Sequence, residues 1–153
     1  MANSSRPGTR IVSIVAGAGL FLCAASVGSA DSDALPKGFK TTPVLKSGKT
    51  ADGDPFAYPK TDKAEIVSVL GVLEPGGRTP LHQHPMPTYV YVMEGALEVQ
   101  TEGKQVRTYK TGEAFMESVG RWHQAHNKSD KPAKILVVFV AEEGKPTTVN
   151  KQQ

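Results

Sequence analysis

The feature that most limits the fold is a series of short apolar runs, rich in β-branched residues and separated by turn-forming pairs. Glu94-Gly95, Glu102-Gly103 and Thr111-Gly112 break the chain at short, even intervals, which is typical of an all-β barrel or sandwich. No run has a sustained helical period, and no segment repeats. We therefore expect an all-β fold. The expected strands are residues 66–73, 81–84, 88–93, 96–101, 105–109, 114–117 and 135–140, the last of them buried on both faces.

Three of the four histidines have the spacing of a metal site. His82 and His84 are two residues apart, and side chains two apart on a strand project from the same face. His123, from a later strand, would complete a facial set of three imidazoles. Such a set suits one divalent Fe, Mn, Ni, Zn or Cu ion per chain and leaves positions for water or substrate. His126 follows His123 by three residues, so it should face the other way and not bind the metal.

The residues around these histidines resemble the two sequence motifs of the cupin superfamily. The matching positions are Gly76, His82, His84 and Gly95 in the first motif and Gly112, Gly120, His123 and Asn127 in the second. Thr88 stands where the first motif usually has Glu, and Ser118 where the second usually has Pro. The resemblance covers residues 70–140 and implies a single jelly-roll β-barrel, a double-stranded β-helix, that holds one metal. It implies little about the reaction, because one fold hosts many chemistries.

The missing Glu at Thr88 bears most directly on mechanism. In cupins with the full motif that Glu is a fourth metal ligand, and threonine is too short and too weak a donor to replace it. A site of three neutral imidazoles would leave a position open for an anionic substrate, or for substrate and oxygen together. Glu117 shares parity with Phe115, an expected core residue, so it is the candidate to enter the cavity as ligand, ligand support or general base. The alternative for Glu117 is a salt bridge at the barrel mouth.

The pocket around the metal is expected to be apolar. Alternation along residues 88–93 turns one set of side chains inward and directs Tyr89 and Tyr91 to the outer face. The expected pocket residues are Thr88, Val90, Val92, Phe115 and Trp122, the last of them at the pocket mouth.

The first 30 residues have the layout of a secretory signal peptide. Arg6 and Arg10 precede an uncharged apolar run at residues 11–25, and small residues lead to a cleavage site after Ala30. The run is short for a spanning helix, which needs about 20 residues, so we expect no stable membrane anchor after cleavage. An uncleaved anchor is the alternative. The sequence therefore predicts a periplasmic or secreted protein.

Cleavage would leave 16 basic and 15 acidic residues, and no basic stripe is visible, so nucleic acid is not an expected partner. We expect an irregular arm at residues 31–63, with a candidate edge strand at 42–45, then the barrel at 64–145 and a flexible tail at 146–153. The arm would pack on its own barrel or on a neighbour. Together with the outward tyrosines it favours a homodimer.

Two functions fit these residues. An enzyme would be a metal-dependent oxidoreductase of the dioxygenase type, acting on a small oxygen-rich molecule such as a diketone, a phenol or a sugar acid, with Glu117 as the candidate base. A non-catalytic barrel would bind a metal or small ligand, or would be purely structural with a relict site. The missing Glu favours the non-catalytic alternatives, whereas three retained histidines favour a working metal site.

Overall fold

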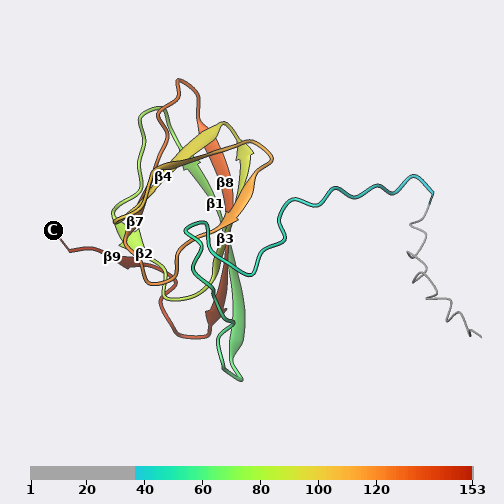
Figure 1. Ribbon diagram of the computed structural model, residues 1–153, viewed down its shortest axis with the longest axis vertical. Helices are drawn as coiled ribbons and strands as arrows, with labels where there is room; N and C mark the ends of the chain where they lie inside the picture. The colour runs from blue at the N-terminus through green and yellow to red at the C-terminus, as the bar shows by residue number, and fades with distance from the viewer. Residues whose placement is uncertain (1–36, 153) are drawn as a thin grey trace, which may run out of the picture. The chain divides into compact units, whose positions relative to one another are not determined.

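Nine β-strands form two antiparallel sheets in the computed structural model, which describes residues 37–152 (Figure 1). The strands are β1 (Ala64–Leu73), β2 (His82–Gln83), β3 (Thr88–Glu94), β4 (Ala96–Thr101), β5 (Arg107–Lys110), β6 (Ala114–Met116), β7 (His123–His126), β8 (Ala133–Glu142) and β9 (Val149–Asn150). No helix occurs among these residues, so none of them forms a helix capable of crossing a membrane. The all-β prediction is confirmed.

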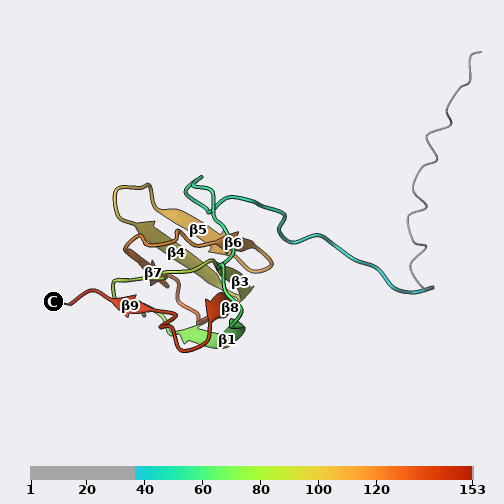
Figure 2. The same ribbon diagram turned by 90° about the horizontal axis from the view of Figure 1, so that it is seen from below.

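The two sheets make the walls of a barrel, as the view in Figure 2 shows. One sheet has the strand order β1-β8-β3-β6 and the other has the order β5-β4-β7-β2-β9. Their inner faces supply a core of aliphatic and aromatic side chains between them. The buried members of the core are Leu73, Met86, Val90, Val92, Leu97, Val99, Phe115, Ala125, Ile135, Val137, Phe139 and Ala141.

The alternation predicted for β3 is confirmed. Thr88, Val90 and Val92 are buried, whereas Tyr89 and Tyr91 are half-buried on the opposite face. Glycine ends the same strand because the backbone turns at Gly95 with a φ of 80°. A Cβ at this position would lie 2.7 Å from the carbonyl oxygen of Pro132, so only glycine fits without a shift.

The structure corrects three expectations about strands. Residues 42–45 form no strand, because they are exposed throughout and lie beside no partner strand within residues 37–152. Residues 135–140 are buried on one face only, since Leu136, Val138 and Val140 are half-exposed. The expected flexible tail contains β9, whose Val149–Asn150 pairs with His82–Gln83 of β2, because that edge of the sheet offers free backbone groups.

The arm preceding the barrel packs partly on its own chain. The amide of Ala51 donates to the carbonyl of Met116 at 2.8 Å. The hydroxyl of Ser118 donates to the carboxylate of Asp52 at 2.5 Å, and that carboxylate is only 4% exposed. Arg121 adds an ion pair with Asp54 at 2.9 Å. Ser118, at the position where the motif usually has Pro, thus fastens the arm to the end of β6.

We expect Ser118→Ala to lower the free energy of unfolding by about 1–3 kcal/mol, because it leaves the Asp52 carboxylate buried without its main donor. Urea denaturation measures this change. Ser68→Ala, at an exposed position of β1, is the matched control and should change stability by less than about 0.5 kcal/mol. Equal stability of Ser118→Ala and wild type would contradict the anchoring role.

Candidate metal centre

The fold brings the three predicted histidines together. His82 lies in β2 directly opposite His123 of β7, and His84 follows two residues later on the same face as His82. Their ring centroids are 4.4 to 5.1 Å apart. One ring nitrogen from each lies within 4.8 Å of the others, and all three side chains are buried. The three histidines therefore form a cluster that could hold a metal ion.

Each imidazole is held by a hydrogen bond from Nδ1 to a backbone carbonyl. Nδ1 of His82 lies 2.7 Å from the carbonyl oxygen of Pro80, and Nδ1 of His123 lies 2.9 Å from that of Arg121. Nδ1 of His84 lies 2.7 Å from the carbonyl oxygen of Thr147. Because a carbonyl oxygen only accepts, Nδ1 carries the proton in all three rings. Neutral rings then present the Nε2 lone pairs, which is how a metal-binding histidine is normally oriented.

Glu117 adds a carboxylate to this cluster. Its Oε2 lies 3.0 Å from Nε2 of His84, and its Oε1 lies 3.4 Å from Nε2 of His123. Burial alone would raise the pKa of Glu117, but its contacts with these two histidines outweigh burial and lower that pKa from 4.5 to about 2. The carboxylate is therefore charged at neutral pH.

The cluster has more acceptors than donors. When the rings are neutral, Nε2 of His84 and the carboxylate of Glu117 are both acceptors, although they lie 3.0 Å apart. Among residues 37–152, no hydrogen-bond donor reaches the buried Nε2 of His123. Close acceptors need a positive charge between them, either protons on the rings or a metal ion. The donor set thus fits a borderline divalent transition metal.

A cavity of about 150 Å³ adjoins the cluster. Its wall includes His82, His84 and Glu117, and most of the remaining wall is aliphatic or aromatic. The other lining residues are Thr79, Val90, Leu97, Ala125, Ile135, Val137, Phe139 and Thr148. The site is therefore a small, mostly apolar chamber with its polar groups on one side.

The predicted pocket residues divide into three groups. Val90 lines the cavity. Thr88, Val92 and Phe115 are buried as expected, but they lie in the core beside the cavity and are not part of its wall. Trp122 lies outside the cavity and is half-exposed, because its parity is opposite to that of His123. Nζ of Lys151 lies 5.5 Å from the centroid of its ring.

Several wall residues went unnoticed in the sequence. Ile135, Val137 and Phe139 alternate inward along β8, so their period-two pattern was an available signal. The carbonyl of Thr147 and the side chain of Thr148 carried no such signal, because they reach the site through the pairing of β9 with β2. His126 lies outside the cluster, as its parity predicted.

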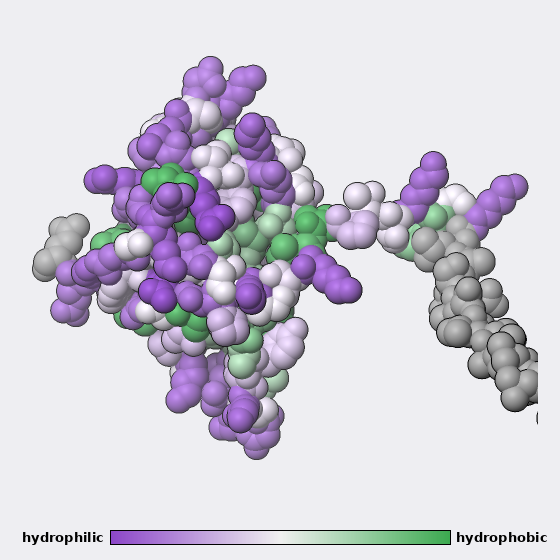
Figure 3. All heavy atoms as spheres, viewed as in Figure 1, coloured by the Kyte–Doolittle hydropathy of each residue, from purple (hydrophilic) through white to green (hydrophobic). Residues whose placement is uncertain are grey.

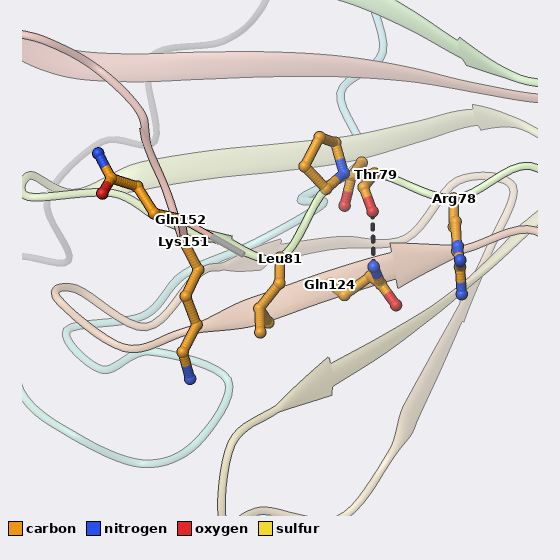
Figure 4. Close-up of a pocket in the computed structure, with 7 residues that line it drawn as sticks. Arg78, Thr79, Leu81, Gln124, Lys151 and Gln152 are labelled. Atoms are coloured by element: carbon orange, nitrogen blue, oxygen red, sulfur yellow. Dashed lines mark hydrogen bonds between the residues drawn. The ribbon is translucent and has the colours of Figure 1, made fainter.

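A larger hollow, of about 550 Å³, shares the lining residue Thr79 with this cavity (Figure 4). It is lined by Arg78, Thr79, Pro80, Leu81, Gln124, Lys151 and Gln152. Its hydrogen bond between Gln124 Nε2 and the Thr79 carbonyl, 2.7 Å long, holds the loop to β7. The two charged residues that line it, Arg78 and Lys151, are both exposed, so they have the chemistry of ordinary solvated surface residues.

Comparison with known proteins agrees with the fold. A family model described as "Cupin domain" matches residues 69–139. The chain is 32% identical over 130 residues to germin-like protein subfamily 2 member 2 of Arabidopsis thaliana, which covers 78% of this chain and 58% of that protein. It is also 34% identical over 65 residues to tetracenomycin polyketide synthase protein TcmJ of Streptomyces glaucescens. This match covers 42% of this chain and 43% of that protein.

The chain belongs to the cupin superfamily, and the resemblance seen in the sequence is confirmed. The solved structure of the DMSP lyase DddQ from Ruegeria pomeroyi has a TM-score of 0.50 at 24% identity, covering 65% of this chain and 47% of that one, which is a likeness of fold alone. The chain spans about half the length of the curated relatives described above.

We expect metal affinity to fall with pH below the pKa of His123. Burial acts to lower this pKa, but the neighbouring Glu117 outweighs burial and raises it above 6.5. Below that pKa the metal must displace a proton from His123, which costs about tenfold in affinity per pH unit. Burial lowers the pKa of His82, so a second proton competes only in more acidic solution.

Co²⁺ dissociation constants between pH 5.5 and 8.5 measure this dependence. The affinity should level off above the pKa of His123, because binding there releases no proton from that ring. A dissociation constant that stays the same across the whole range would contradict binding through His123.

Proposed function

We propose that the barrel binds one divalent transition metal through His82, His84 and His123 and uses it on a small oxygen-rich molecule. One observation carries this proposal: three buried imidazoles, each fixed by an Nδ1 hydrogen bond, bring one ring nitrogen each within 4.8 Å of the others, and two of them line a cavity. A bound metal would supply Lewis acidity and a template for substrate or oxygen. The reaction class we infer is a dioxygenase-like oxidation.

The size of the cavity limits the substrate. A cavity of about 150 Å³ lined by apolar side chains is large enough for benzene. A phenol or a short diketone is close to this size, whereas a sugar acid is much larger and more polar. The apolar wall around Val137 and Phe139 would hold the hydrocarbon part of such a substrate and exclude bulk water. The oxygen atoms of the substrate would then face the metal.

The metal-binding part is tested by single substitutions. We expect His82→Ala and His123→Ala each to weaken binding of Mn²⁺ or Co²⁺ by at least about 100-fold, because each removes one of the three nitrogen donors. His126→Ala is the matched control, since His126 lies outside the cluster. Titration calorimetry and metal analysis of protein without a histidine tag provide the measurement. Stoichiometric metal in the double variant of His82 and His84 would contradict the proposal.

The catalytic part needs a second measurement. Oxygen uptake by the metal-loaded protein is followed with a panel of small diketones and phenols, with His123→Ala as the inactive control. Uptake that depends on His123 supports the enzyme. Tight binding of metal or panel compounds without oxygen uptake would instead indicate the alternative, a non-catalytic metal-binding or ligand-binding barrel.

We also propose export to the periplasm or outside the cell. This proposal rests on the signal-peptide pattern of residues 1–30, which lie outside the described residues. Mass determination of the protein recovered from its native host tests it: a mature amino terminus at Asp31 supports the proposal, and an intact leader on cell-bound protein contradicts it.

We further propose that two copies pair through the outer face of the β1-β8-β3 sheet. Ile66 and Leu70 of β1 are 65% and 71% exposed, and their partners across the ladder are Val140 and Leu136 of β8. The outward Tyr91 lies beside Leu136 on the other side. The side of the molecule drawn in Figure 3 is mostly hydrophilic, with hydrophobic residues in small separate patches. An apolar face that is continuous across three strands can pack against the same face of a second copy of the chain.

We expect a sedimentation mass of two chains at micromolar concentration and one chain for Leu70→Glu, because a buried charge at this point would oppose association. Val106→Glu, at an exposed position outside this face, is the matched control and should remain a dimer. A wild-type mass of one chain would contradict the pairing.

A further inference from the structure

The residue in the usual place of the acidic ligand cannot bind a metal. Thr88 is fully buried, and its hydroxyl donates to the carbonyl of Met86 at 3.2 Å. Thr88 is also absent from the wall of the cavity. If the barrel has a carboxylate ligand, it must come from another strand.

Glu117 reaches the site from the neighbouring position on the next strand. In the β3-β6 ladder, Tyr89 pairs with Met116 and Val90 with Phe115. The amide of Glu117 donates to the carbonyl of Thr88 at 2.9 Å, which continues this ladder by one step. Thr88 and Glu117 are both buried, on the inner face of the sheet, so their Cβ atoms are cross-strand neighbours roughly 4.5–5.5 Å apart.

The distances at Glu117 are those of two ligands on one metal. Two donor atoms that each lie about 2.1 Å from one ion are about 3.0 Å apart at a right angle and about 3.4 Å apart at a tetrahedral angle. The carboxylate oxygens lie 3.0 Å from Nε2 of His84 and 3.4 Å from Nε2 of His123. Little movement would be needed for one ion to contact all three groups.

We propose that Glu117 is the fourth metal ligand, so that the carboxylate missing from β3 is supplied by the adjacent position beyond β6. This inference rests on the proposed metal site and deepens it. The centre then has three imidazoles and one carboxylate, with a net charge of about +1 for a divalent ion, not the +2 of a three-histidine set. Val90, Val137 and Phe139 line the cavity beside this centre, where a substrate or oxygen would have room to bind.

The competing role for Glu117 is that of a hydrogen-bond acceptor that holds protonated histidines in place. The two roles differ in the metal-free protein. An acceptor for imidazolium stabilises the fold without metal, whereas a ligand matters chiefly when metal is bound. Glu117→Gln separates them, because an amide of the same shape can donate to the Nε2 lone pairs of neutral rings but is a poor metal ligand.

The experiment titrates Co²⁺ into wild type and variants, and records both the dissociation constant and the visible spectrum of the bound ion, which reports the ligand set. Thermal unfolding without metal is measured on the same proteins below and above the pKa of His123, because an acceptor for imidazolium stabilises the fold only below that pKa. Glu94→Gln is the matched control, because it removes one exposed carboxylate at the hairpin end of β3. The key variant exchanges the two residues, with Thr88→Glu and Glu117→Thr in the same chain, so that the carboxylate stands on β3; it is called the exchanged pair.

We expect Glu117→Gln to weaken Co²⁺ binding by at least about 100-fold and to change the spectrum, with no fall in metal-free unfolding temperature above the pKa of His123. Glu94→Gln should match wild type. The exchanged pair should regain at least tenfold of the lost affinity, whereas Glu117→Thr alone should not. Thr88→Glu alone should be destabilised, because it places a second carboxylate in a packed site.

Two outcomes are distinguishable failures. If wild type binds Co²⁺ and Glu117→Gln binds it with the same affinity and spectrum, the three-histidine site stands and Glu117 is not a ligand. If wild type and His123→Ala both fail to bind Co²⁺, the proposed function itself fails. Should the exchanged pair not fold, Glu117→Gln alone still decides the question, since it changes no volume.

Discussion

The arrangement of the site depends on the Nδ1 hydrogen bonds that tie three imidazoles to backbone carbonyls. A histidine on a strand can rotate about two bonds and can carry its proton on either nitrogen. Bonds of 2.7 Å from His82 to Pro80 and of 2.7 Å from His84 to Thr147 remove both freedoms. One ring nitrogen of each histidine then stays within 4.8 Å of the others, and because the hydrogen bonds hold the rings, little binding energy is lost in ordering the ligands.

Alternation along strands explains how much of this was predictable. The shared face of His82 and His84, the inward set from Thr88 to Val92 and the burial of Glu117 beside Phe115 all follow from a period of two. The prediction that Trp122 lies at the pocket mouth is wrong, because Trp122 has the parity opposite to the buried His123. The misassigned strand at 42–45 and the β9 pairing depend on which edge finds a partner, and a local pattern carries no information about that.

The role of Glu117 illustrates a limit of motif matching. A motif records which sequence position usually carries a group, whereas a metal responds only to where the donor atom lies. In a sheet, two positions far apart in the chain can be neighbours across a ladder, as Thr88 and Glu117 are through the bond between their backbones. The parity of Glu117 was readable from the sequence. Its proximity to His84 and His123 was not, because it depends on the order β8-β3-β6 and on the facing sheet.

The support of the site comes from segments outside the matched motifs. The chain after β8 returns through β9 to the edge beyond β2, where the carbonyl of Thr147 holds His84. The arm contributes Asp52, whose buried carboxylate accepts from Ser118, the residue next to Glu117. Both ends of the barrel chain therefore restrain the loops that carry His84 and Glu117. The Thr147 restraint uses a backbone carbonyl, so the side chain at that position is free to vary while His84 stays in place, whereas the restraint on the loop after Glu117 requires the side chains of both Asp52 and Ser118.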